Sequence, residues 1–285
     1  MTLAFDLSLI SYFGALLLAS ANLFTKERKW LAAAATVGLA AGAAMQTVYM
    51  ILRWVAAGRA PFSNMFESLV LFAWAVVVVY LALQIRRRVP VLGAATALLA
   101  VFALAYASSF ESKIEPLMPA LRSNWLTFHV FTCFLGYGGV TVAFLSSLGY
   151  LFVTRSRGPA PSSESDQRGD ASADNGLKSA FPEMAAALEA ATEKTISFGF
   201  LFLTVGIISG AVWANSAWGT YWSWDPKETW SLITWFIYAI FLHCRFMRGW
   251  RGRRAAWISV IGFASVIFTY VGVNYLLSGL HSYAK

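Results

Sequence analysis

The chain has only three histidines, and imidazole is the side chain best suited to bind a metal or move a proton near neutral pH. His129 and His281 lie near the ends of long apolar stretches, whereas His243 lies inside one. An ionisable residue within an apolar helix is a functional candidate, although a hydrogen-bonded packing role is the simpler interpretation of any single histidine. The three together are more informative, because His129 and His281 flank one unusual segment.

That segment, residues 213–235, holds six of the twelve tryptophans and a compact charged group. Scattered aromatic residues are common at any membrane surface. Four aromatic residues within seven positions instead favour a shaped surface for a flat organic ligand or for a partner protein, since cofactor sites are typically lined by apolar and aromatic groups. The aromatic residues are Trp218, Tyr221, Trp222 and Trp224, and the charged ones are Asp225, Lys227 and Glu228.

The chemistry that best fits both features is haem binding. His129 and His281 could supply the two axial ligands of a haem iron, and the aromatic segment could cover the porphyrin. Zinc fits less well, because Asp225 and Glu228 lie among aromatic rings rather than in a metal-ligand spacing. Serine hydrolase chemistry fits poorly, since the sequence has no nucleophile elbow. The two cysteines, at positions 133 and 244, are interpreted as packing residues rather than redox groups.

These residues must be positioned by membrane helices. The sequence is 58% hydrophobic and 13% charged, with a mean hydropathy of +0.60, whereas soluble domains carry about 25% charged residues. A membrane-spanning helix needs about 20 mostly apolar residues. We therefore predict an all-α, polytopic membrane bundle of about eight helices, near 7–24, 31–55, 66–85, 91–109, 126–153, 196–214, 231–247 and 256–277.

The distribution of basic residues predicts the orientation of this bundle. Sixteen of the 22 Lys and Arg lie in the loops after the first, third, fifth and seventh segments. Cytoplasmic loops carry the Lys/Arg excess. Both termini and the tryptophan-rich loop are therefore expected on the outer face.

The chain is also expected to divide into a five-helix part (1–155), a linker (156–195) and a three-helix part (196–285). Residues 156–179 are rich in Ser, Gly, Pro and acidic residues, a composition typical of a flexible linker. Residues 180–195 could continue it as a short amphipathic helix.

A second loop, residues 58–68, contains Pro61, Asn64 and Glu67 where the third segment begins. One interpretation is a turn with an acidic residue in the first helical turn, where the helix dipole favours it. The other is a lining for the same outer site. The residues alone leave both open.

WGTYWSWDPKETW (218–230) resembles the tryptophan-rich WWD signature of haem-handling membrane proteins. ITWFIYAIFLHCR (233–245), GLHSY (279–283) and GRAPFSNMFESLVLFAW (58–74) are similar to one branch, the CcsA/ResC type of System II cytochrome c biogenesis proteins. The resemblance covers about residues 50–283 apart from the linker.

This resemblance implies a subunit of a cytochrome c synthase, in a bacterial inner membrane or a plastid thylakoid membrane. With a CcsB/ResB-type partner, it would move haem b to the outer face and present it to the CxxCH motif of reduced apocytochrome c. Thioredoxin-like proteins could keep those thiols reduced. By matching positions, His129 and His281 would ligate the iron at the outer site. His243 would hold haem within the membrane together with a histidine of the partner subunit.

Further roles are expected of the tryptophan-rich loop. Its aromatic residues would pack on the macrocycle, while Lys227 or Arg59 would pair with the anionic propionates. Asp225 and Glu228 would cap a helix whose first residue is Pro226. Two alternatives remain open: a haem exporter or delivery protein without synthase activity, and a membrane scaffold whose tryptophan-rich loop docks a partner.

Overall fold

The computed structural model describes residues 1–25, 28–86, 89–117, 121–155 and 174–277, with side chains from residue 182 in the last range. Within these ranges the regular secondary structure is entirely helical. The elements are α1 (Thr2–Phe24), α2 (Lys29–Ala57), α3 (Met65–Arg86), α4 (Leu92–Ala107), α5 (Asn124–Arg155), α6 (Asp174–Trp218), α7 (Pro226–Met247), α8 (Arg253–Ile267), the π-helix η2 (Phe268–Gly272) and α9 (Val273–Leu276).

Each of the eight predicted segments corresponds to one helix or continuous helical run. Seven helical runs in the described residues are long and apolar enough to cross a membrane, with α8, η2 and α9 forming one of them, and α4 is a shorter apolar helix of 16 residues. A helix satisfies its own backbone hydrogen bonds, which lipid cannot do. The prediction of an all-α, polytopic helical membrane protein is confirmed.

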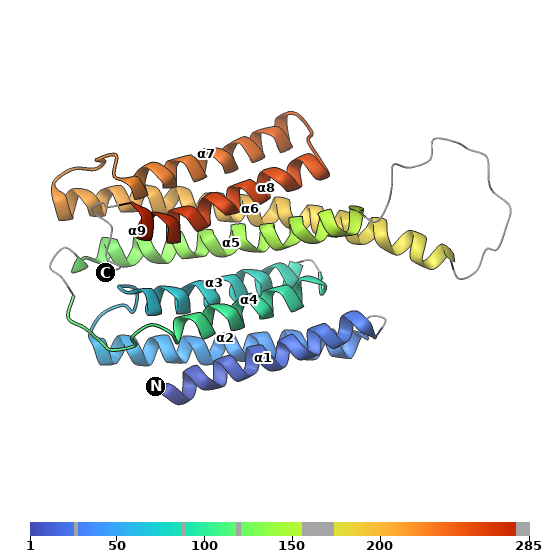
Figure 1. Ribbon diagram of the computed structural model, residues 1–285, viewed down its shortest axis with the longest axis horizontal. Helices are drawn as coiled ribbons and strands as arrows, with labels where there is room; N and C mark the ends of the chain where they lie inside the picture. The colour runs from blue at the N-terminus through green and yellow to red at the C-terminus, as the bar shows by residue number, and fades with distance from the viewer. Residues whose placement is uncertain (26–27, 87–88, 118–120, 156–173, 278–285) are drawn as a thin grey trace.

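The helices run side by side along the long axis of the molecule (Figure 1). Helix α5 packs against α3 on one side and against α6 and α8 on the other. The first side buries a core that joins α1–α4, and the second buries a smaller core shared by α5–α8. At Gly139 of α5 an added Cβ would lie 2.8 Å from the Cα of Gly199, so the contact between α5 and α6 depends on residues without side chains.

Helix α6 begins earlier than the sequence suggests. Residues 180–195 belong to this 45-residue helix rather than to a separate short one, whereas residues 156–173 of the expected linker lie outside the described part. Leu188 and Ala191 are fully buried, and Arg245 of α7 forms an ion pair of 2.8 Å with Glu193. This packing explains why the helix continues through a stretch that was expected to be linker.

The antiparallel helices gather three loops at one end of the bundle, which we call the aromatic end. These loops are 58–64 between α2 and α3, 108–123 between α4 and α5, and 219–225 between α6 and α7. The N-terminus of α1 lies at the same end (Figure 1). Since α5 begins here as well, His129 and the tryptophan-rich loop share one end of the molecule.

Candidate functional site

The start of α7 fixes the tryptophan-rich loop. Asp225 is the N-cap and its side chain accepts a hydrogen bond from the Lys227 N–H at 3.0 Å, while Pro226 is the first helical residue. Glu228 completes a capping box by accepting from the backbone N–H of Asp225 at 3.3 Å. The predicted capping roles of Asp225, Pro226 and Glu228 are confirmed.

The same glutamate shapes the loop that precedes the helix. Its carboxylate also accepts from the N–H of Ser223 at 2.8 Å. Trp224, between Ser223 and Asp225, has φ = 59°. This left-handed conformation is uncommon for a bulky residue and is characteristic of functional sites. The Trp222 and Trp224 rings meet edge to face at 5.8 Å. The loop is therefore a defined structure and not a loose aromatic belt.

A cavity of about 670 Å³ lies at the aromatic end, within the range of about 300–1,000 Å³ typical of ligand sites. It is bounded by α3, α5, α6, α7, η2, α9 and parts of all three loops. Its lining includes four of the residues predicted to bind haem, namely His129, Tyr221, Trp222 and Lys227, and much of the rest is apolar or aromatic. Residues far apart in the chain therefore meet at one site.

His129 projects from the first turns of α5 toward α6. Its Nδ1 lies 2.7 Å from the carbonyl oxygen of Gly206, and its ring stacks on Trp213 at 6.1 Å. A carbonyl can only accept, so Nδ1 carries the proton and Nε2 is the basic nitrogen of the ring. Metal-binding histidines usually have this arrangement, because the second hydrogen bond fixes the tautomer and the ring orientation. Gly210 makes room for the ring, since an added Cβ there would lie 2.6 Å from Cε1.

Lys227 brings a cationic group to the cavity. Its Nζ donates to Asn274 Oδ1 of α9 at 2.7 Å. Asn274 and Tyr275 also line the cavity, so α9 forms part of the same wall. His281 follows Tyr275 by six residues and lies outside the described part of the chain.

Other predicted residues are not on the cavity lining. Trp218 packs against the buried Trp213, edge to face at 4.8 Å. The Trp224 side chain is 68% exposed, and Arg59 pairs with Glu67 at 3.0 Å. Asp225 acts at the helix cap.

His243 is separate from the cavity. It is exposed on α7, nine residues beyond Thr234, which does line the cavity. Nine residues correspond to about 14 Å along the helix and to its opposite face. Its neighbour Cys244 is buried, and both Cys133 and Cys244 are free thiols. Cys133 lines the cavity, with Sγ 3.6 Å from His129 Nδ1.

The sequence did not predict Tyr270 as a lining residue of the cavity. Tyr270 lies in the π-helix η2, a rare element often found at functional sites. Its hydroxyl is 2.6 Å from Ser68 Oγ of α3, and its ring meets Phe134 of α5 edge to face. A tyrosine within an apolar segment gave only a weak signal, and a π-turn has no clear sequence pattern.

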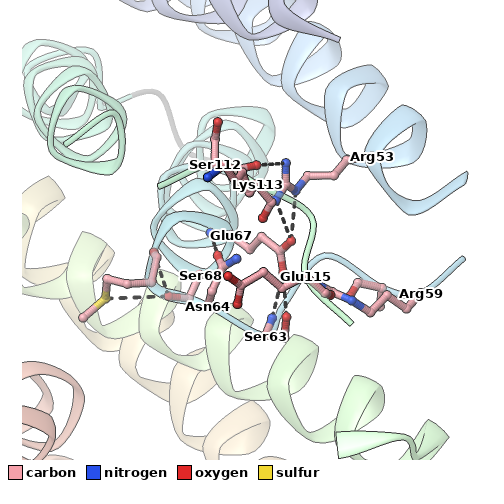
Figure 2. A network of polar contacts seen from close by, with 11 residues as sticks. Arg53, Arg59, Ser63, Asn64, Glu67, Ser68, Ser112, Lys113 and Glu115 are labelled. Atoms are coloured by element: carbon pink, nitrogen blue, oxygen red, sulfur yellow. Dashed lines mark hydrogen bonds and ion pairs between the residues drawn. The ribbon is translucent and has the colours of Figure 1, made fainter. Parts of the chain in front are cut away.

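Segment 58–68 agrees with both interpretations of its sequence, since Glu67 lies in the first turn of α3 and other residues of the segment line the cavity. Ser63 and Asn64 line the cavity, and the Asn64 side chain accepts from the Glu67 N–H at 2.8 Å. Glu67 lies behind this wall, fully buried between Arg53 and Arg59 (Figure 2).

Fold and site together define a polytopic helical membrane protein with a large, aromatic-lined cavity at one end of its bundle. Residues 62–281 match the family described as Cytochrome C assembly protein. The chain is 40% identical over 287 residues to the "Cytochrome c biogenesis protein CcsA" of Synechococcus sp. (strain RCC307), covering 95% of this chain and 92% of that one. It is 39% identical to the CcsA of Gloeobacter violaceus, covering 83% and 82%.

A solved structure, "Cytochrome c Heme Lyase CcmF", superposes with a TM-score of 0.61 at 18% identity, over 94% of this chain and 45% of that one. At this identity the match supports the fold alone. The relatives at about 40% identity carry the assignment: the chain belongs to the CcsA family of cytochrome c assembly proteins. Its role is therefore in cytochrome c maturation.

Proposed function

We propose that the aromatic-end cavity holds haem and presents it for covalent attachment to an apocytochrome c, with this chain acting as a synthase subunit. The observation that carries the proposal is the meeting of His129, Trp222 and Lys227 on one cavity. An imidazole, an aromatic wall and a cation match the three parts of haem, which are its iron, its macrocycle and its propionates.

His129 is the proposed first axial ligand. Its Nδ1 hydrogen bond to Gly206 supports this role, because it orients Nε2 as the ligating atom. His281 is the proposed second ligand. The six residues from Tyr275 to His281 can extend at most about 20 Å, which is enough to reach across a cavity of this size.

The remaining contacts follow from position. Tyr221 and Trp222 would pack on the macrocycle, and Lys227 is better placed than Arg59 to pair with a propionate, because Arg59 is already engaged by Glu67. Haem b is the proposed substrate. The chemistry at its vinyl groups belongs to haem and the apocytochrome thiols, while this chain supplies position.

We propose that His243 marks a second, intramembrane haem position that is completed by a CcsB/ResB-type subunit. The His243 side chain is exposed on the surface of α7, which supports a site shared with a partner. The distribution of Lys and Arg supports a cytoplasmic face opposite the aromatic end, with the aromatic end in the periplasm or lumen. Thioredoxin-like proteins would keep the apocytochrome thiols reduced.

The proposal is tested by purifying the chain with its partner subunit, supplying haem and reduced apocytochrome c, and measuring covalent haem on the apocytochrome. The expected result is holocytochrome with the wild type and a large loss with His129→Ala, whereas Lys29→Ala, at the opposite end, leaves the yield unchanged. Haem bound by the wild type without holocytochrome would instead assign delivery alone. No bound haem would leave the scaffold interpretation.

A further inference from the structure

The buried carboxylate of Glu67 is the centre of a network that joins two walls of the cavity (Figure 2). Its side chain is 0% exposed, and the side chains of Arg53 and Arg59 are 4% and 10% exposed. Arg53 Nε donates to Oε1 at 2.9 Å, and Arg59 Nη1 donates to Oε2 at 3.0 Å. Burying a carboxylate without partners is costly, so this pairing fixes all three side chains relative to one another.

The carboxylate directly holds the loop between α2 and α3. Oε2 also accepts from the N–H of Ser63 at 2.9 Å and from its hydroxyl at 3.1 Å. Together with the Asn64 cap of α3, these bonds close the loop on the first turn of the helix. Ser63 and Asn64 both line the cavity, whereas Glu67 does not.

Through the two arginines the same carboxylate holds a second loop. Arg53 Nη1 donates to the carbonyl of Ser112 at 2.8 Å, and Arg59 Nη2 donates to that of Glu115 at 3.1 Å. Residues 111–117 form neither helix nor strand, so these bonds tie the segment to α2 and α3. Glu111, Lys113 and Glu115 line the cavity, and they carry charged groups at its edge.

We propose that Glu67 is a positioning residue: it orients Arg53 and Arg59 so that they fix segment 111–117 as a wall of the cavity, and it thereby sets how tightly the ligand is retained. The retention part rests on the proposed function. The claim that Glu67 fixes segment 111–117 does not depend on the proposed function, and it is tested without any ligand.

The decisive variant is Glu67→Gln, which keeps the size of the side chain but leaves two buried guanidinium groups without a counter-ion. Gln46→Leu is the matched control. Gln46 is also fully buried on α2, where it accepts from Tyr12 and donates to the Val70 carbonyl, yet none of these three residues lines the cavity. Arg59→Gln is a milder second variant, since it leaves the Arg53–Glu67 pair intact.

Two quantities are measured on the purified complex with its partner subunit. Tryptic cleavage after Lys113, whose side chain is 78% exposed, is followed without haem as a measure of how firmly the segment is held. Haem release to a scavenger protein is followed after loading. Glu67→Gln is expected to raise the rate of cleavage after Lys113 and the haem release rate by roughly tenfold each, the effect of losing a hydrogen bond to a charged group. Arg59→Gln is expected to give a smaller increase in both, and Gln46→Leu to change neither by more than about twofold.

An unchanged rate of cleavage after Lys113 in Glu67→Gln overturns the proposal, as does an equal increase in Gln46→Leu. If Glu67→Gln does not fold, Arg59→Gln decides by the same criterion. Faster cleavage with unchanged haem release refutes the proposed effect of Glu67 on ligand retention. Absence of haem from the wild type contradicts the proposed function, while the cleavage rates still decide whether Glu67 fixes the loop.

Discussion

The contact between Gly210 and His129 gives a sharp prediction about the haem ligand. Gly210 lies one turn after Gly206 on α6, whose carbonyl holds the imidazole at 2.7 Å. A Cβ at position 210 would lie 2.6 Å from His129 Cε1 and 2.7 Å from Nδ1. Ordinary contact begins near 3.4 Å, so the ring must move by about 0.8 Å in the Gly210→Ala variant.

The magnitude follows from three opposing effects. Overpacking a filled interior costs about 1–3 kcal/mol, and losing the hydrogen bond to Gly206 costs about 0.5–1.5 kcal/mol. Replacing a helical glycine by alanine returns about 0.5–1 kcal/mol. The net loss of folding stability is about 0.5–4 kcal/mol. The effect on haem is larger, because disturbing a hydrogen bond that orients a metal-binding histidine weakens metal affinity by roughly 10–100-fold.

The assay is a haem titration of the purified complex, followed by absorbance, together with a thermal unfolding curve of each variant. Gly262→Ala is the control for overpacking, since its Cβ would lie 2.7 Å from the Tyr238 ring, away from the cavity. Gly14→Ala is the control for helix propensity, since its Cβ meets nothing within 4 Å. The reasoning is refuted if Gly210→Ala binds haem as tightly as the wild type, or if Gly262→Ala weakens binding equally.

Three further predictions concern the tryptophan-rich loop. Trp222→Ala weakens haem binding by about tenfold or more, because it removes a large ring from the cavity wall. Trp224 is exposed, so Trp224→Ala changes haem binding by less than about twofold. Equal effects of the two variants in the same titration would contradict the geometry. Lys227→Met weakens binding by about tenfold through the loss of a charge-assisted contact, and the exposed Lys29→Met at the opposite end serves as its control. Asp225→Ala lowers folding stability by about 1 kcal/mol through the loss of the N-cap, whereas Asp225→Ser keeps most of that stability. Thermal unfolding measures both variants, and no difference between them would argue against the cap.

Local sequence rules predicted the helices and the start of α7 well. Apolar length alone located every membrane segment, and the order Asp225, Pro226, Glu228 predicted a capped helix that the structure has. These features depend on neighbouring residues, and backbone hydrogen bonding within lipid leaves little choice other than a helix.

The continuation of α6 through residues 180–195 could not be predicted in the same way. The composition of the preceding stretch is typical of a linker, but Leu188 and Ala191 are buried by other helices and Arg245 pairs with Glu193. Tertiary contacts of this kind add stability to a helix beyond its own propensity, and a local pattern does not contain them.

The site was predictable in its residues more than in its arrangement. His129, Trp222 and Lys227 stood out by type, and the cavity brings them together. The roles of Glu67 and Tyr270 depend on partners 14 and 202 residues away along the chain, Arg53 and Ser68 respectively. Spacing does not reveal such pairs, and the same limit applies to Arg59, which pairs with Glu67 and does not line the cavity.

The most direct test of the central claim is the absorption spectrum of the complex purified in detergent from haem-replete cells. Wild type is compared with the His129→Ala/His281→Ala double variant, both co-expressed with the partner subunit. Bis-histidine haem in the cavity predicts a reduced low-spin spectrum in the wild type and its loss in the double variant. Wild type without haem, or a double variant with an unchanged spectrum, would contradict the assignment of haem to this cavity.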